Sequence, residues 1–376
     1  MKNRVAESSR PATFVPPGMP ELDQSGNPVS FFEFWPVWLV YLPVALQWSL
    51  LSLRYRSLTL PLIANPAIPL SGMVGVAKSA VLRQAGSEAS GWILPWIEYQ
   101  VEDAPIPEQV SRINELLPDA GLALPLVGKP SIGCRGAGVR LLQSEQELHA
   151  YLSRFPVSAT IQFQQLAPWE AEAGVFYVRH PGRRQGEITS LTLKYMPYVV
   201  GDGRSTLGEL VARDPRAGRL ISVYRPRHEA HWQTVIEQGR PYRLVFSASH
   251  CRGAIFRDGR EYITEQLSKT LDRIFDDIPG FHYGRLDIKF QDLESLREGR
   301  NFVIIEINGA SSESIHIWDR NARFGAAVAT LLGQYRTLFR LGQANRRLGH
   351  RPPGLRALWD AWRHESRLVK QYPAND

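Results

Sequence analysis

The chain has 376 residues, of which 44% are hydrophobic and 22% are charged, and this composition fits a globular protein and excludes a disordered one. The formal net charge of +7 favours an anionic partner, which can be a nucleotide, a phospholipid surface or a nucleic acid. The only two cysteines, Cys134 and Cys251, lie far apart without metal-ligand spacing, which argues for a reducing compartment and against a disulfide framework or a zinc site.

The first notable segment is an uncharged, apolar run from Phe34 to Leu53, which follows a proline-dotted arm without the pattern of a cleavable signal peptide. Its length suits a membrane-spanning helix, but Pro36 and Pro43 interrupt it. Its tryptophans, and the two arginines after it, are typical of a segment at the lipid headgroups. A third alternative is a buried helix pair that packs on the body, and the three stay open.

Residues 57–76 have the turn signals of a loop. A helical pattern begins at Lys78, a strand is expected over 93–101, and a helix is expected over 107–117. These elements predict a small, reduced α/β region.

A glycine-rich turn follows, inside the segment 122–152. A strand ends at Lys129, the turn contains Gly133, Gly136 and Gly138, and a second strand leads to a helix that Ser144 caps. Glycines let the backbone approach phosphate oxygens, and a lysine at the strand end can reach the same anion. The alternative is a flexible hairpin, because the spacing fits neither the P-loop nor the dinucleotide fingerprint.

The strands expected between 160 and 200 carry polar groups suited to a nucleotide. Gln165 and Glu172 lie where a strand leaves its sheet, which suits the base and ribose, and Lys194 lies in the middle of a later strand. For Lys194 the alternative is a solvated surface lysine. A capping box at Thr206 then begins a helix, and Asp258-Gly259 is predicted to be a hairpin turn.

A bend near residue 250 contains Arg252, whose guanidinium is suited to a substrate carboxylate. Towards the C-terminus, amphipathic helices are expected over 322–341 and 355–370. Trp359 and Trp362, on the second helix, either pack on the body or contact a membrane beside the apolar run. The basic residues are dispersed and no nucleic-acid-binding motif appears, so we expect no nucleic-acid partner.

The most informative stretch runs from Tyr283 to Ser314 and predicts an antiparallel hairpin of 286–290 and 302–307. Folding about residue 296 places Asp287 opposite Glu306 and puts Arg285 and Asn308 on the same face. Leu286, Ile288, Val303, Ile305 and Ile307 are then expected on the apolar face. Two carboxylates and an amide oxygen suit a hard divalent cation, and the alternative is a cross-strand salt bridge on a solvated face.

Taken in this order, these motifs resemble the ATP-grasp superfamily, in particular D-alanine–D-alanine ligase and cyanophycin-synthetase-like carboxylate–amine ligases. The resemblance covers roughly residues 78–321. It implies an α/β (α+β) ATP-grasp fold, in which two α+β subdomains hold ATP between antiparallel sheets, with an atypical short N-terminal α/β piece. The expected parts are an arm with the apolar segment (1–56), a reduced α/β region (57–120), a small subdomain (121–200), a large subdomain with the metal site (201–335) and a basic C-terminal helix (336–376).

The resemblance also implies roles for single residues. ATP would be bound by Lys78, Lys129, Gly133, Gly136, Gly138, Gln165, Glu172 and Lys194. Two Mg²⁺ ions, or Mn²⁺, would be held by Asp287, Glu306 and Asn308. Arg285 would stabilise the charged intermediate.

The implied reaction joins a small-molecule carboxylate to an amine through an acyl phosphate, with release of ADP and phosphate. The alternatives are a kinase acting on a small molecule and a membrane-tethered nucleotide-binding protein without turnover. We expect a cytoplasmic chain with a peripheral contact, through Phe34–Leu53, to the inner face of the membrane. The chain lacks the full N-terminal domain with which such ligases usually begin, so the substrates and the oligomeric state stay open.

Overall fold

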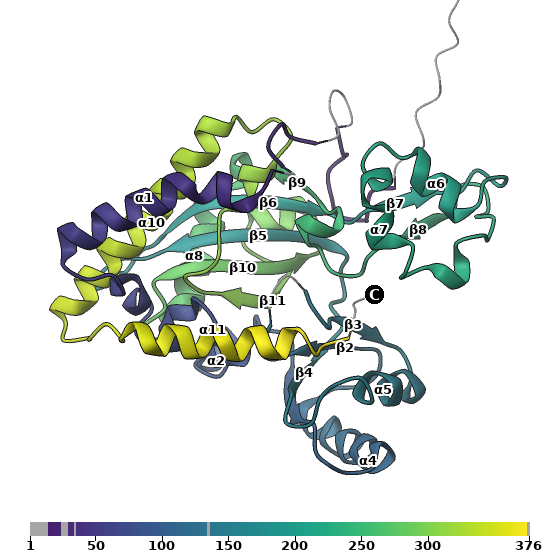
Figure 1. The fold of residues 1–376 in the computed structure, drawn as a ribbon, viewed down its shortest axis with the longest axis horizontal. Helices are drawn as coiled ribbons and strands as arrows, with labels where there is room; N and C mark the ends of the chain where they lie inside the picture. The colour runs from purple at the N-terminus through teal and green to yellow at the C-terminus, as the bar shows by residue number, and fades with distance from the viewer. Residues whose placement is uncertain (1–13, 24–28, 34, 134–135, 374–376) are drawn as a thin grey trace, which may run out of the picture.

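The computed structural model describes residues 14–23, 29–33, 35–133 and 136–373. These residues form a four-stranded sheet, a five-stranded sheet, a two-stranded ribbon and long helices that cover the larger sheet (Figure 1). Both sheets are antiparallel and carry helices on their faces, which confirms the predicted class of two α+β subdomains.

The smaller subdomain contains the sheet of order β1-β4-β2-β3. Its elements are β1 (Trp96–Gln100), α4 (Ile106–Leu116), β2 (Leu126–Pro130), β3 (Arg140–Leu142), α5 (Glu145–Leu152) and β4 (Thr160–Gln165). The Ser144 side chain accepts a hydrogen bond from the Glu147 amide and caps α5, as its spacing predicts. Because β1 and α4 share a core with the later strands, residues 96–120 lie in this subdomain, whereas a boundary was expected at 121.

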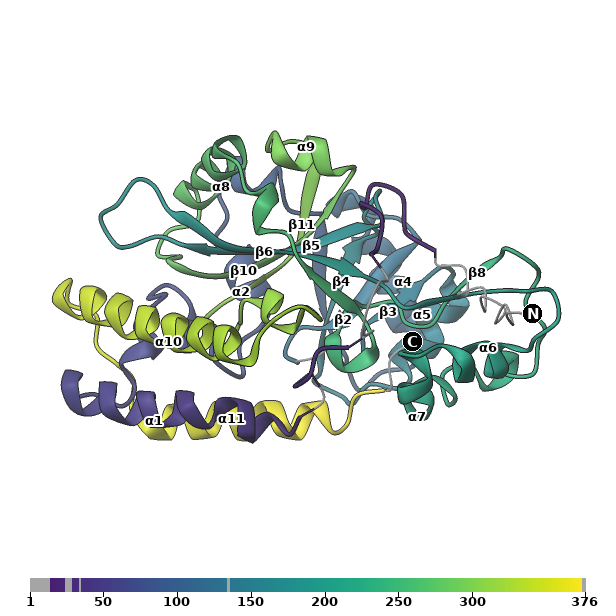
Figure 2. The same cartoon turned by 90° about the horizontal axis from the view of Figure 1, so that it is seen from above.

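The larger sheet has the order β11-β10-β5-β6-β9. Its strands are β5 (Ala171–Val178), β6 (Glu187–Tyr195), β9 (Ile255–Asp258), β10 (Tyr283–Phe290) and β11 (Phe302–Asn308). The helices associated with it are α2 (Ser79–Leu82), α3 (Ser87–Ser90), α8 (Glu265–Asp276) and α9 (Leu293–Arg297). The apolar side of α8 packs on one face of this sheet, and α10 (Phe324–Arg347) covers the other (Figure 2). The strands β5 and β6, expected in the small subdomain, thus belong to the large one.

The hairpin of β10 and β11 has the predicted pairing, with Asp287 opposite Glu306 and Arg285 opposite Asn308. A bulge shifts the register directly after Asp287, so that Ile288 pairs with Ile304. Phe302 and Ile304 therefore face the core, while Val303 and Ile305 are only partly buried. The prediction that Val303 and Ile305 line the apolar face was wrong, because strict alternation does not account for the extra residue.

A third, smaller unit is the ribbon of β7 (Tyr198–Val200) and β8 (Pro241–Arg243), with α6 (Leu207–Arg213) and α7 (Ile221–Tyr224) packed on it. The predicted capping box of Thr206 and Glu209 begins α6. The predicted hairpin at Asp258-Gly259 was wrong. The strand before it, β9, pairs with β6, and a single 3-10 turn follows the glycine.

Two further helices lie on the outside of the molecule. The helix α1 (Val37–Tyr55) packs along α10, and α11 (Leu355–Val369) crosses the lower edge of the larger sheet in Figure 1. The apolar segment is thus one helix with Pro43 inside it, rather than a helix pair. Within the described residues, α1 is the one helix long and apolar enough to cross a membrane.

Candidate functional site

The two sheets meet where β2 of the small subdomain faces β11 of the large one. Lys129, at the end of β2, reaches across this junction with its ammonium group. Its Nζ donates to the backbone oxygen of Ile305 on β11 at 2.9 Å and to Oε1 of Gln164 on β4 at 2.8 Å. One buried lysine therefore bonds to both sheets and marks the cleft between them.

Next to this junction lies a chain of buried charges on β5, β6 and β10. The Nζ of Lys194 is 2.8 Å from Oδ1 of Asp287 and 3.1 Å from Oε1 of Glu172. The other oxygen of Glu172 is 2.9 Å from Nζ of Lys289. Because neighbouring strands are in register, with Glu172 opposite both Lys194 and Lys289, the sheet itself aligns these groups on one face.

The two carboxylates of this charge network, Asp287 and Glu172, are ionised at neutral pH. Burial raises the pKa of Asp287, but the charges of Arg285 and Lys194 outweigh that effect and hold it well below its usual range. Burial likewise raises the pKa of Glu172, and the nearby charges of Lys289 and Lys194 lower it overall. The face is therefore an alternating array of fixed charges.

Lys129 has the opposite character. Burial disfavours its ammonium form and lowers the pKa of Lys129 to about 8, although the charges of Glu306 and Asp287 counteract part of this effect. A bound anion would favour the charged form, so this lysine is poised to gain from an anionic ligand.

The rim of the site is formed by both strands of the β10–β11 hairpin and by the segment before α2. Arg285 donates from Nε to Oδ1 of Asp287 at 2.9 Å, and Asn308 donates to Oδ2 of the same carboxylate at 3.3 Å. Glu306 is less enclosed, with its side chain 28% exposed, and it lies 3.9 Å from Nζ of Lys78. Glu306 is thus the carboxylate most open to a ligand.

The glycine-rich turn covers this rim, and its Cys134 and Arg135 lie outside the described residues. Lys78 donates to the backbone oxygen of Gly133 at 2.8 Å, and Arg252 donates to that of Gly136 at 3.2 Å. Gly138 has φ +67° and packs against Pro130, where a Cβ would come within 3.1 Å of the ring. The turn, which belongs to the small subdomain, is therefore held by two cations from outside that subdomain.

The glutamines of β4 divide between the cleft and the solvent. Gln162 and Gln164 point to the cleft side of the small sheet, since Ile161 and Phe163 face its core. The side chain of Gln162 is fully buried, and neither its oxygen nor its nitrogen has a hydrogen-bond partner among the described residues. Gln165, which the sequence placed near the base, ends the strand and is half-buried.

Two side chains and one backbone oxygen that the sequence did not indicate take part in the network. Lys289 lies two residues after Asp287, so strand alternation could have placed it on the same face. Gln164 could have been found in the same way. Glu313 accepts from Trp318 at 2.8 Å while its backbone oxygen lies 3.3 Å from Arg285, and no local pattern announces it.

The site fits a polyphosphate accompanied by a divalent cation. Five cations (Lys78, Lys129, Lys194, Lys289 and Arg285) outnumber the three carboxylates (Glu172, Asp287 and Glu306), and Gln162 offers an unpaired amide. Two carboxylates and one amide suit Mg²⁺, which typically takes one or two protein carboxylates and fills its shell with phosphate oxygens and water. Among the residues that the structure describes, no group of three or more His, Cys, Asp or Glu side chains is placed to hold a metal ion.

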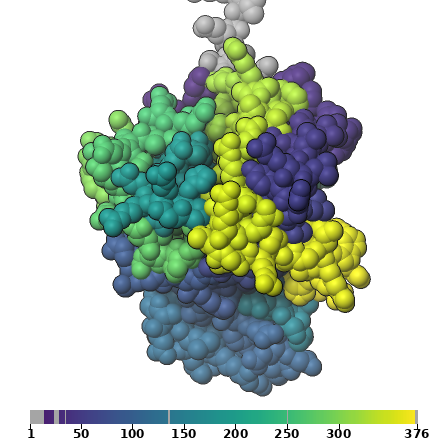
Figure 3. All heavy atoms as spheres, turned by 90° about the vertical axis from the view of Figure 1, so that its left-hand side faces the viewer, coloured from purple at the N-terminus to yellow at the C-terminus, as the bar shows by residue number. Residues whose placement is uncertain are grey.

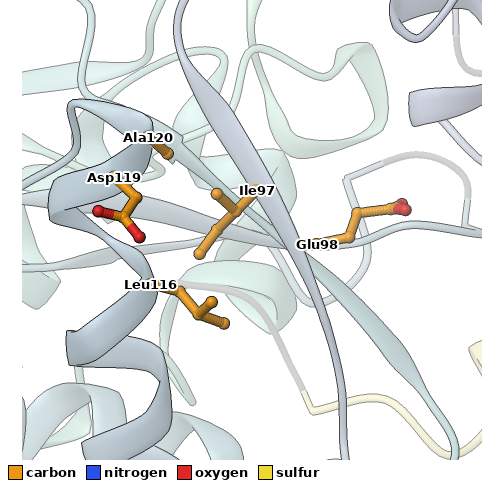
Figure 4. Close-up of a pocket in the computed structure, with 5 residues that line it drawn as sticks. All are labelled: Ile97, Glu98, Leu116, Asp119 and Ala120. Atoms are coloured by element: carbon orange, nitrogen blue, oxygen red, sulfur yellow. The ribbon is translucent and has the colours of Figure 1, made fainter.

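One other hollow of the surface lacks such chemistry. The hollow in Figure 4, with a volume of about 400 Å³, lies between β1 and the end of α4 and is lined by Ile97, Glu98, Leu116, Asp119 and Ala120. It holds two carboxylates and no cation, and the Glu98 carboxylate points away from the other four side chains. The charged cleft is therefore the better candidate.

A scan against models of protein families and a search of the curated proteins find no match for this chain. Among solved structures, it is similar to D-alanine–D-alanine ligase from Bacillus anthracis, with 13% identity, TM-score 0.40, and 74% of this chain and 72% of that one covered. It is also similar to the VanG D-Ala:D-Ser ligase from Enterococcus faecalis, with 14% identity, TM-score 0.36, and 69% and 63% covered.

A third similar structure is the bifunctional glutathione synthetase from Pasteurella multocida, with 14% identity and TM-score 0.33 over 68% of this chain. The match spans 36% of the length of that synthetase. These structures are ATP-grasp ligases, the superfamily that the sequence resembles.

Proposed function

We propose that the chain is an ATP-dependent ligase that joins a carboxylate to an amine. The observation that carries the proposal is the convergence, from both sheets, of five cations on three carboxylates, with the unpaired buried amide of Gln162 opposite Lys129 on the neighbouring strand. A buried site with excess positive charge is costly unless an anion fills it, and a nucleoside triphosphate with Mg²⁺ has the required charge and donor preferences.

In this proposal the two subdomains divide the nucleotide between them. Lys129, Lys194 and Lys78 bind the phosphates, and the backbone of Gly133, Gly136 and Gly138 lies over them. Glu172 and the glutamines at the end of β4, including Gln165, bind the nucleoside. Asp287, Glu306 and Asn308 would hold one or two Mg²⁺ ions, which supply charge neutralisation for phosphoryl transfer.

The proposed reaction has two steps. An oxygen of the substrate carboxylate attacks the γ-phosphorus of ATP, and the bond from that phosphorus to the β-γ bridging oxygen breaks. ADP is released, and the substrate becomes an acyl phosphate. The amine nitrogen then attacks the acyl carbon, and the tetrahedral intermediate expels inorganic phosphate and leaves an amide. Overall, a carboxylate, an ammonium ion and ATP give an amide, ADP, hydrogen phosphate and one proton.

Positioning and charge neutralisation are the main contributions of the protein to such chemistry. Arg285, fixed by two bonds to Asp287, would stabilise the oxyanion of the tetrahedral intermediate. Arg252, which contacts the glycine-rich turn, would bind the substrate carboxylate by a charge-assisted hydrogen bond. Burial of Arg252 lowers its pKa, yet a guanidinium keeps its charge at neutral pH.

The test uses hydroxylamine as a general amine. The purified chain, with ATP and Mg²⁺, is supplied with a panel of amino acids and other carboxylates, and ADP and hydroxamate are measured together. A ligase gives both in equal amounts, because the acyl phosphate is captured as a hydroxamate. A kinase instead gives ADP with a stable phosphorylated product and no hydroxamate.

The control variants separate the cleft from the rest of the surface. Lys194→Gln is expected to abolish hydroxamate formation. Lys269→Gln removes a lysine of α8 whose side chain is 62% exposed, and it is expected to leave the rate unchanged. Mg²⁺-dependent ATP binding without ADP release across the whole panel would contradict the ligase and favour a nucleotide-binding protein without turnover.

A further inference from the structure

The outer face of α1 is apolar and exposed. The helix buries only Val40 and Val44 in the core, whereas Trp38, Leu46 and Leu50 are 61–68% exposed. No charged residue occurs between Val37 and Leu53, so nothing polar interrupts this face except Ser49. A soluble monomer rarely leaves so continuous an apolar surface uncovered.

A second exposed apolar stripe lies on α11. This helix has no buried residue, and it is fixed to the body on one side, where Glu365 accepts from the Gly75 amide at 2.6 Å. Leu355, Trp359 and Trp362 are about half exposed on its outer side. Beside them lies a row of exposed basic side chains, namely Arg356, Arg363, Arg367 and Lys370.

The two helices lie on the same side of the molecule. In Figure 2 both run along the lower edge of the view, and in Figure 3 both lie on the right-hand side, one above the other. Their apolar stripes therefore belong to one face, here called the α1/α11 face.

The contacts of α1 show that it lies flat against the body. Gln47 donates to the backbone oxygen of Leu332 at 2.7 Å, and Arg346 donates to that of Tyr55 at 3.0 Å. Trp48 contacts Phe339 edge to face. Because α10 holds α1 along its length, crossing a bilayer would break all of these contacts, whereas lying at its surface breaks none.

The charges around the α1/α11 face identify its partner. The face carries the exposed basic groups of α11 together with exposed Arg54 and Arg56. Within α1 and α11, Asp360 is the one exposed carboxylate. A second copy of the chain would bring two sets of like charges together. An anionic lipid surface complements the basic groups, while tryptophan side chains favour the headgroup region.

We infer that the α1/α11 face docks the protein on an anionic lipid bilayer, with α1 and α11 lying parallel to the membrane plane. The sequence predicted such a contact for Phe34–Leu53 alone, and the structure adds a second helix and a basic border. Residue 34 lies outside the described residues, so the docking surface begins at Val37. This inference is independent of the proposed catalytic function.

The docked helix is joined to the cleft by two polar contacts. Tyr41 of α1 donates to the carboxylate of Glu313, whose backbone oxygen accepts from Arg285. Glu33, before α1, pairs with Arg216, which donates to the backbone of Gly253, next to Arg252. Docking would therefore hold the cleft beside the lipid surface.

Flotation of the full chain with vesicles tests the inference. Vesicles with about 30% phosphatidylglycerol should carry the protein upward, and pure phosphatidylcholine should bind at least about tenfold less, since each basic residue near an anionic surface contributes roughly a fivefold gain. Binding should fall in about 0.5 M NaCl, because salt screens these charges.

Variants on both helices sharpen the test. Leu46→Glu with Leu50→Glu, and separately Trp359→Ala with Trp362→Ala, should each weaken binding. Replacing Arg363 and Arg367 by glutamine should weaken it roughly 25-fold. These side chains are exposed, so the free energy of unfolding, measured by urea denaturation without lipid, should be nearly unchanged. Val157→Glu, at a residue 54% exposed on the small subdomain, is the matched control and should bind like the wild type.

Three outcomes would overturn the inference. The first is the absence of flotation with anionic vesicles, and the second is equal binding to neutral ones. The third is a dimer in sedimentation equilibrium that the same α1 variants dissociate while vesicle binding does not change, since a second copy would then cover the face.

Discussion

The cleft and the α1/α11 face depart from ordinary burial in opposite directions. In the cleft, charged groups such as Lys194, Asp287 and Glu172 are nearly inaccessible, and each has a partner of opposite sign. On the α1/α11 face, apolar side chains such as Trp38 and Leu50 are mostly exposed. Buried charge and exposed apolar surface are the two informative exceptions to the rule that apolar groups lie inside.

The contrast between buried charge in the cleft and exposed apolar surface on the α1/α11 face indicates a different kind of missing partner for each region. The cleft has its internal contacts but retains excess positive charge and an unpaired Gln162, so it is adapted to a small polyanion. The α1/α11 face exposes apolar side chains that the body of the protein leaves largely uncovered, so it is adapted to a large partner that supplies an apolar surface. Substitutions should therefore affect folding and chemistry in the cleft, and only association on the face.

The largest effect is expected for Asp287→Asn. Removing this charge leaves Arg285 without its buried counter-ion and leaves Lys194 with Glu172 alone, and breaking a buried pair typically costs about 3–5 kcal/mol. The free energy of unfolding, measured by urea denaturation, should fall by this amount at pH 7. A loss below about 1 kcal/mol would mean that solvent screens the network, as at an ordinary surface salt bridge.

The same carboxylate gives the sign of the acid response. The folded pKa of Asp287 is held below its unfolded value of about 4, so its contribution to stability is present above that pH and is lost as the pH falls below it. The wild type should lose more stability between about pH 5 and pH 3 than Asp287→Asn does.

A smaller effect, confined to chemistry, is expected for Glu306→Gln. Glu306 is partly exposed and its one cationic neighbour is 3.9 Å away, so the fold should tolerate the loss of its charge. ADP release should nevertheless fall roughly 100-fold or more, because one cation ligand and several kcal/mol of transition-state stabilisation are removed. Glu265→Gln, at a side chain 75% exposed on α8, is the control. Turnover at the wild-type rate would remove Glu306 from the site.

A smaller effect than that of Glu306→Gln is expected on ATP affinity from the titration of Lys129. Its pKa of about 8 means that the ammonium form needed for phosphate binding is lost as the pH rises above that value. The dissociation constant for ATP should rise about tenfold per pH unit above pH 8. Lys129→Arg, which stays charged, should flatten this rise. A flat profile in the wild type would show that another group controls phosphate binding.

Local features of the cleft could be predicted from the sequence, whereas features that depend on distant segments could not. Asp287 and Glu306 were placed opposite each other because a hairpin is local and alternation has a period of two. The bulge after Asp287, and the pairing of β1 with β4, depend on packing between distant segments and leave no local signal. Glu313 joins the network only because the chain folds back after β11.

The apolar segment illustrates the same limit. Composition indicated that residues 34–53 are unusually apolar, but it did not decide between burial and exposure. That depends on α10, nearly 300 residues later in the chain, which covers Val40 and Val44 and leaves Leu46 exposed. The exposed side of the helix could therefore be recognised only in the structure.

The smallest expected effect tests whether that side is uncovered in the folded chain. Without lipid, Leu46→Gln should change the free energy of unfolding by less than about 0.5 kcal/mol, because an exposed side chain has few contacts to lose. Val44→Ala, two residues earlier and 4% exposed, should cost roughly 1–3 kcal/mol through lost packing against α10. If Leu46→Gln cost as much as Val44→Ala, the outer side of α1 would be covered by this chain or a second copy in solution. A large difference instead means that folding leaves this apolar surface uncovered.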